Sequence, residues 1–85
     1  MTLSRNELMT YLSTSLHVDI QDLADDAPLF SAGRVDSFAV TDLILFVEES
    51  IGHRLPAPEV TMDNFDSIAA ILALAERQII KAEGV

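Results

Sequence analysis

The 85-residue sequence contains no cysteine and few residues that interrupt regular structure. Without cysteine, neither disulfides nor Cys-ligated zinc can stabilise the fold, so it has to depend on an apolar core. Glycine and proline occur only three times each, and 49% of the residues are hydrophobic. This composition is typical of an ordered chain, and the length predicts one small domain over residues 1–85.

Basic residues are also scarce: five Lys and Arg stand against fourteen Asp and Glu, a formal net charge of −9. This charge repels nucleic acids and anionic membranes, whereas it favours proteins with basic surfaces as partners. The sequence has no apolar run long enough to span a bilayer, and its start, MTLSRNELMT, lacks the apolar region of a signal peptide. We therefore expect a cytoplasmic monomer.

A first helix is predicted from Ser4 to about residue 16 or 17. Ser4 and Glu7 form a capping box, and Leu8, Leu12 and Leu16 recur every four residues as one apolar stripe. Residues 18–35 then show no sustained period, which predicts a long loop of the kind that is commonly functional in a small domain. Its apolar residues are expected to lie on the core; they are Leu23, Leu29 and Phe30.

The second helix is expected from Asp36, its N-cap, to about residue 50 or 51, with Gly52 just past its end. Ser37 then takes the first helical position. Two prolines exclude a long helix in the connector that follows, and a short helical turn is predicted over residues 62–65.

The last helix is predicted from Asp66, as its N-cap, to about Ala82. Its apolar stripe comprises Ile68, Ile71, Leu72, Ala75 and Ile79. Three main helices and one short helix, without a β-pattern or a repeat, predict an all-α fold, a small four-helix bundle.

The second helix has apolar residues on two faces when it is drawn at about 100° per residue. The core face comprises Val40, Leu43, Ile44, Val47 and Ile51, with Phe46 at its margin. Phe38 and Leu45 fall on the opposite side. The polar residues beside them are Thr41, Asp42, Glu48 and Glu49.

Two readings of this outward face are open. Single exposed apolar residues are common, and the loop over residues 18–35 can also fold over Phe38 and bury it. The alternative is a recognition face, in which Phe38 and Leu45 give affinity and the acidic rim steers basic partners.

Ser37 lies beside this face, and its surroundings disfavour catalysis. No GxSxG or SxxK motif surrounds it, and His17 and His53 lie at predicted helix ends. The acidic residues lack EF-hand spacing, so no metal site is predicted. A serine at a helix N-terminus can carry a phosphate-containing group, because the helix dipole stabilises an anion there, or it can be an ordinary helix-start residue.

Two stretches carry a family resemblance, DSFAVTDLILFVEESIGHRLP (36–56) and PEVTMDNFDSIAAIL (58–72). The first resembles the Asp-Ser-(Leu/Phe) attachment segment of acyl and peptidyl (aminoacyl) carrier proteins. The second is similar to their third helix and the start of their fourth. Those proteins are four-helix bundles with a 4′-phosphopantetheine arm on that serine, and the resemblance covers nearly the whole chain.

The resemblance implies that Ser37 bears the covalent 4′-phosphopantetheine and that Asp36 is the acid of the motif. The implied partner-recognition residues are Phe38, Thr41, Asp42, Leu45, Glu48 and Glu49. Asp66 and Ser67 repeat the Asp-Ser pattern, but few acids follow them, so we interpret this pair as an ordinary N-cap.

The implied function is a carrier without catalysis of its own. A phosphopantetheinyl transferase would load Ser37, an adenylating ligase or acyltransferase would charge the arm's thiol as a thioester, and a downstream acyl- or aminoacyl-accepting enzyme would take the cargo. Tethering raises the effective concentration of cargo at each partner.

Phe38, the Pro-rich connector and the absence of flanking domains favour a free-standing aminoacyl or peptidyl carrier. Arg34 and Val35, which precede the motif, disfavour the fatty-acid type. The alternatives are a polyketide, specialised or fatty acyl carrier, an acidic helical adaptor without a prosthetic group, and a hydrolase that uses Ser37.

Overall fold

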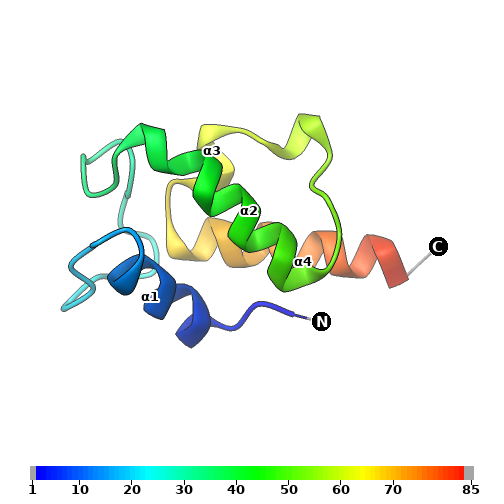
Figure 1. Cartoon of the computed structure of the whole chain (residues 1–85), viewed down its shortest axis with the longest axis horizontal. Coiled ribbons are helices and arrows are strands. Elements are labelled where there is room, and N and C mark those ends of the chain that lie inside the picture. The colour runs from blue at the N-terminus through cyan, green and yellow to red at the C-terminus, as the bar shows by residue number, and fades with distance from the viewer. Residues whose placement is uncertain (1, 84–85) are drawn as a thin grey trace.

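The computed structural model describes residues 2–83, which form helices and loops without a β-strand. The α-helices are α1 (Arg5–Thr14), α2 (Val40–Ile51), α3 (Met62–Phe65) and α4 (Ile68–Glu83), and two short 3₁₀ turns cover Ser37–Ala39 and Ala57–Glu59. Helices α1, α2 and α3 all contact α4 (Figure 1). The predicted all-α four-helix fold is confirmed.

Helix α1 begins where its capping residues predict. The Ser4 hydroxyl accepts a hydrogen bond from the Glu7 N–H at 3.1 Å, and Leu8 and Leu12 are fully buried. The helix ends at Thr14, two or three residues earlier than predicted, and His17 takes a left-handed conformation with φ of 57°. The predicted stripe therefore contributes two leucines from the helix, and Leu16 packs on the core from the loop.

The predicted long loop connects α1 to α2 (Figure 1), and its apolar residues pack on the core. Leu23 and Leu29 are buried, and Phe30 is half-buried against the same core, as expected. Asp66, from the α3–α4 junction, fastens the loop: its carboxylate accepts hydrogen bonds from the Phe30 N–H (2.7 Å), the Ser31 N–H (2.9 Å) and the Ser31 hydroxyl (2.6 Å). The loop therefore has a defined course up to the start of α2.

The prediction that Asp66 caps the last helix is wrong. Helix α4 begins at Ile68, and the Ser67 hydroxyl accepts the hydrogen bond from the Ala70 N–H at 3.0 Å. The Asp66 carboxylate is not available as a cap because it binds Phe30 and Ser31 of the loop. A contact between residues 36 positions apart decided this, and local sequence rules do not detect such contacts.

The buried surface of α4 is wider than the predicted stripe. Ile68, Ile71 and Ala75 are buried as expected, but Leu74 is also fully buried, and Leu72 and Ile79 are only partly buried. The reason is that three helices surround α4, so its contacts extend beyond one face.

Candidate functional site

The Asp36–Ser37 pair lies where the long loop ends and the chain enters helix α2. The Asp36 carboxylate accepts a hydrogen bond from the Phe38 N–H at 2.9 Å, and the Asp36 carbonyl accepts one from the Ala39 N–H at 2.8 Å. Asp36 is thus the N-cap, as predicted. Ser37 opens the 3₁₀ turn that leads into α2, whose regular helix begins three residues later, at Val40.

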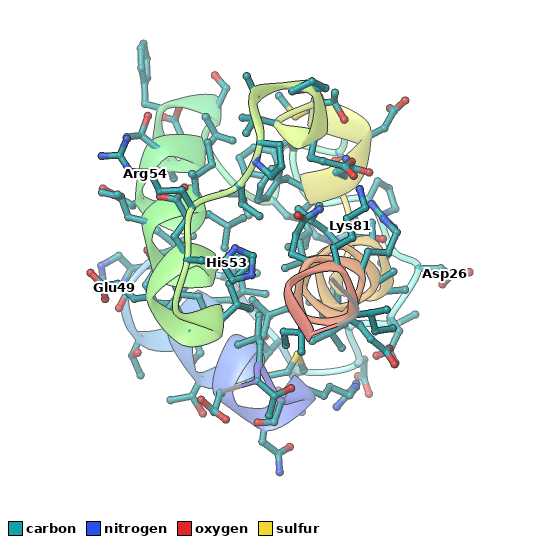
Figure 2. All side chains as sticks on the ribbon, turned by 90° about the vertical axis from the view of Figure 1, so that its right-hand side faces the viewer. Asp26, Glu49, His53, Arg54 and Lys81 are labelled. Carbon is teal, nitrogen blue, oxygen red and sulfur yellow. The ribbon has the colours of Figure 1, made fainter. Side chains whose placement is uncertain are left out.

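The Ser37 hydroxyl is exposed and has no hydrogen-bond partner within residues 2–83. His53 points inward between α2 and α4 (Figure 2), and its ring Nδ1 lies 3.2 Å from the Arg54 carbonyl. His17 is exposed in the loop after α1. Among the described residues, neither histidine is hydrogen-bonded to Ser37. The arrangement offers a hydroxyl that a second protein can reach and activate.

The helix-start N–H groups beside Ser37 are largely used. Phe38 and Ala39 both donate to Asp36, and the Val40 N–H donates to the Ser37 carbonyl. The anion-binding capacity of a helix N-terminus depends on unpaired N–H groups. Ser37 therefore offers an accessible hydroxyl, whereas most of the N–H groups at this helix start are not free to bind an anion.

The outward face predicted for the second helix is present. Phe38 is 90% exposed and Leu45 is 51% exposed, so the alternative in which the loop covers Phe38 is wrong. Thr41, Asp42 and Glu49 are also exposed. On the inner face, Leu43, Val47 and Ile51 are buried, which fixes the orientation of α2.

Glu48 differs from the other acids of this helix. It is half-buried, and its carboxylate accepts a hydrogen bond from the Leu55 N–H at 2.8 Å. This contact closes the connector back on the end of α2. The other predicted recognition residues, Phe38, Thr41, Asp42, Leu45 and Glu49, carry no side-chain hydrogen bond within residues 2–83.

Ser67, the second serine after an aspartate, is half-buried, and its hydroxyl caps α4. The two Asp-Ser pairs thus have opposite roles: in the first the aspartate caps and the serine hydroxyl is exposed, whereas in the second the serine caps and the aspartate binds the loop.

Sequence reasoning missed the Asp66–loop contact and the stacking of Tyr11 on Phe46. The only signal for the stack was the marginal position of Phe46 on the helical wheel.

The part of the chain that the structure describes contains neither a candidate metal site nor a helix that could span a membrane. No group of three or more His, Asp or Glu side chains there is arranged to hold a metal ion. None of the described helices has the length and apolar character that crossing a bilayer requires.

Comparison with known proteins identifies the family. Residues 6–75 match the family model described as phosphopantetheine attachment site. The chain belongs to this family. A D-alanyl carrier protein of Leuconostoc citreum (strain KM20) is similar to it, with 28% identity over 75 residues, 88% of this chain and 95% of the relative.

Members of this family are carrier proteins whose domain bears a covalently attached 4′-phosphopantetheine. The described residues fit such a group in one respect that can be tested on the structure: they present a serine hydroxyl that is exposed and free of internal hydrogen bonds, at the start of a helix. The fold and the cofactor predicted from the sequence are confirmed, while the residue that bears the cofactor stays a prediction.

Proposed function

We propose that Ser37 bears the phosphopantetheine and that the protein carries an aminoacyl or acyl group on it between partner enzymes. The exposed Ser37 hydroxyl, without an internal partner in residues 2–83, is the observation that supports this most strongly. Ser67 is disfavoured because its hydroxyl already caps α4 and is half-buried. Attachment at Ser67 would remove the cap of the helix that organises the core.

Loading is a phosphoryl-group transfer to the serine oxygen from coenzyme A. The Ser37 oxygen forms a bond to the phosphorus on the pantetheine side of the pyrophosphate, and the pyrophosphate linkage breaks. Adenosine 3′,5′-bisphosphate leaves, and the serine proton goes to a base of the transferase, since the described residues place no base on Ser37. Asp36 holds the backbone of this turn through the Phe38 N–H, so that the hydroxyl is presented outward.

Once attached, the arm supplies a terminal thiol that holds the cargo as a thioester. The chain itself supplies a surface that each enzyme can recognise: an apolar centre with an acidic rim next to Ser37. We propose that this face is read by a phosphopantetheinyl transferase, an adenylating ligase or acyltransferase, and a downstream acceptor enzyme. Its members are Phe38, Thr41, Asp42, Leu45, Glu48 and Glu49.

Within the carrier class, we favour an aminoacyl cargo. Phe38 follows the serine, which by the family resemblance favours an aminoacyl or peptidyl carrier, and the similar protein from Leuconostoc citreum is a D-alanyl carrier protein. A specialised or fatty acyl cargo is the alternative. The two can be distinguished by incubating loaded protein with an adenylating ligase, ATP and either an amino acid or a fatty acid. The cargo that becomes attached as a hydroxylamine-labile thioester identifies the class.

The absence of cysteine gives a direct test of the proposal. The unmodified chain has no thiol, so a thiol reagent applied to protein that was incubated with coenzyme A and a transferase, and then freed of coenzyme A, reports only the arm. Wild type and Ser67→Ala are expected to show one thiol per chain, and Ser37→Ala none. One thiol on Ser37→Ala would contradict the proposal.

An adaptor without a prosthetic group would use the same exposed residues, Phe38 and Leu45. The two functions differ in their dependence on Ser37. A carrier with Ser37→Ala loses cargo transfer completely, whereas an adaptor keeps its function in Ser37→Ala and loses it in Phe38→Ala.

A further inference from the structure

A stacked aromatic pair joins α1 to α2 at the edge of the outward face. The Tyr11 and Phe46 rings lie with their centroids 4.0 Å apart and their planes 12° apart. Both side chains are half-buried and pack against the core from one side, so part of each remains at the surface. Such a pair stabilises the contact between the two helices beyond the burial of its area.

A small hollow borders this pair on the α2 side, with a volume of about 260 Å³. It is lined by Tyr11, Ser15, Asp42, Leu45, Phe46 and Glu49. This volume is below the range of about 300–1,000 Å³ that is typical of sites for small-molecule ligands. Its size therefore suits a single side chain of another protein better than a free cofactor or metabolite.

The hollow carries uncompensated negative charge. Asp42 and Glu49 both line it, and neither forms a salt bridge within residues 2–83. Burial of the ring, and then the charges of Asp42 and Glu49, raise the pKa of the Tyr11 hydroxyl, which agrees with the place of both carboxylates beside Tyr11 in the hollow. Figure 2 shows Glu49 on the outer side of α2, pointing away from α4.

A planar cation fits this hollow best, because the hollow combines aromatic rings, two carboxylates and a volume of side-chain size. An arginine guanidinium can stack on an aromatic ring and donate two hydrogen bonds to one carboxylate at the same time. A lysine ammonium lacks the planar fork and is more strongly hydrated, so it matches this site less well. The net charge of −9 also draws basic partner surfaces toward the molecule.

We propose that this hollow is an arginine-binding site, which receives one arginine side chain from a partner protein through Tyr11, Phe46, Asp42 and Glu49. The site extends the contact surface of α2 onto α1 and does not include Ser37. Its role in docking a carrier to its enzymes rests on the proposed function, whereas its capacity to bind arginine does not.

The probe for this test is the tripeptide acetyl-Ala-Arg-Ala-amide, titrated into ¹⁵N-labelled unmodified protein and followed by NMR. We expect saturable shifts that centre on the amides near Tyr11, Asp42, Phe46 and Glu49. The matching citrulline peptide, which keeps the shape and loses the charge, is expected to give no saturable shift. The lysine peptide is expected to bind several-fold more weakly because it lacks the planar donor fork.

Two double variants separate this site from the general acidity of the surface. Asp42→Asn with Glu49→Gln is expected to weaken arginine-peptide binding about tenfold. Asp26→Asn with Glu76→Gln changes the net charge equally at exposed acids outside the hollow, and it is expected to change affinity less than about twofold. Asp26 projects from the opposite side of the molecule (Figure 2). Tyr11→Leu, with both carboxylates kept, is expected to weaken binding several-fold.

Equal binding of the arginine and citrulline peptides would overturn the proposal. So would equal losses in the two double variants, or shifts that centre away from the hollow or fail to saturate. Ser37→Ala protein is expected to bind the arginine peptide like wild type. Failure of the arginine site and failure of Ser37 as attachment residue are thus observed in different experiments.

Discussion

Phe38 is the most exposed large apolar side chain of the described residues, at 90%, and it directly follows Ser37. Its removal costs the fold almost nothing, because a side chain that is already in water loses no burial. Under the proposed function, Phe38 contributes instead through contacts that form when a partner enzyme approaches. Substitution of single residues can therefore distinguish side chains that stabilise the fold from side chains proposed to contact partners.

Phe38→Ala is expected to change the free energy of unfolding by less than about 0.5 kcal/mol. The same change is expected to raise the concentration of carrier needed for half-maximal charging about tenfold, which corresponds to about 1.4 kcal/mol of lost binding. Urea unfolding and steady-state charging kinetics measure the two effects.

Ile80→Ala is the matched control, because Ile80 is also exposed, at 59%, and lies on α4. It is expected to leave both stability and charging close to wild type. An equal charging defect in Phe38→Ala and Ile80→Ala would contradict the assignment of the recognition face to α2.

At the scale of the element, α2 contains a pair of leucines that report on its two faces. Leu43 is fully buried, whereas Leu45 is 51% exposed. Leu43→Ala is expected to lower the free energy of unfolding by about 2–5 kcal/mol, because it leaves a cavity in the core. Leu45→Ala is expected to lower it by less than about 0.5 kcal/mol and to weaken partner binding instead.

Thermal and urea unfolding of the two variants, side by side, test the orientation of α2. The substitution is identical and the positions are two residues apart on one helix, so differences in helix propensity cancel. Similar losses of stability in both variants would show that α2 does not present the Leu45 side to solvent.

Asp66 attaches the loop before α2 to the rest of the fold, and the stability of this attachment depends on pH. Hydrogen bonds from the Ser31 hydroxyl, and then from the Ser31, Phe30 and Leu29 backbone, hold the pKa of Asp66 below its usual value. A carboxyl group whose pKa is lowered by folding contributes stability above its unfolded pKa, and this stability is lost as the pH falls through the folded pKa. The loop attachment should therefore weaken in acid, at and below about pH 4.

Asp66→Asn is expected to reproduce the acid effect at neutral pH. We expect a loss of about 1–2 kcal/mol in the free energy of unfolding and faster hydrogen exchange at the Phe30 and Ser31 amides, because a charged acceptor is replaced by a neutral one. Below the folded pKa of Asp66, the difference from wild type should disappear. A difference that stays constant down to that pH would contradict the role given to the ionised carboxylate.

At the scale of the whole molecule, the net charge of −9 acts on stability and on association. Salt between about 0.01 and 0.15 M shortens the Debye length from about 30 to about 8 Å, which screens repulsion among the acids. Exposed ion pairs such as Arg5–Asp25 are also screened, but exposed pairs contribute little. We expect repulsion among the acids to outweigh the attraction within the ion pairs, so salt should stabilise this protein.

We expect the melting temperature to rise with sodium chloride over this range, and the association rate with a basic partner enzyme to fall. The Asp26→Asn, Glu76→Gln variant should start with a higher melting temperature at low salt and gain less from added salt. A melting temperature that falls with salt in the wild type would show that the ion pairs outweigh the repulsion.

Local rules predicted the features of this fold that are set by neighbours in sequence. The Ser4 cap, the Asp36 cap and the two faces of α2 follow from residues within a few positions of one another. The Asp66–Phe30 contact spans 36 residues, and the Tyr11–Phe46 stack joins two different helices. Such pairs depend on how the helices meet, and a helical wheel of one element contains no information about this.

The same reasoning applies to the candidate site. The position of Phe38 and Leu45 on the outward face was predictable because a wheel divides a single helix into faces. Whether the loop over residues 18–35 covers Phe38, and whether Glu48 binds the Leu55 N–H, depend on the course of the loop and of the connector. The course of that connector is set by tertiary contacts.

The central claim is that Ser37 carries the phosphopantetheine, and an intact-mass spectrum tests it most directly. Wild type, Ser37→Ala and Ser67→Ala are each incubated with coenzyme A and a broad-specificity phosphopantetheinyl transferase, after circular dichroism has shown that all three are folded. We expect a mass increase of one phosphopantetheine in wild type and Ser67→Ala, and none in Ser37→Ala. The same increase in Ser37→Ala, or no increase in folded wild type, would contradict the account.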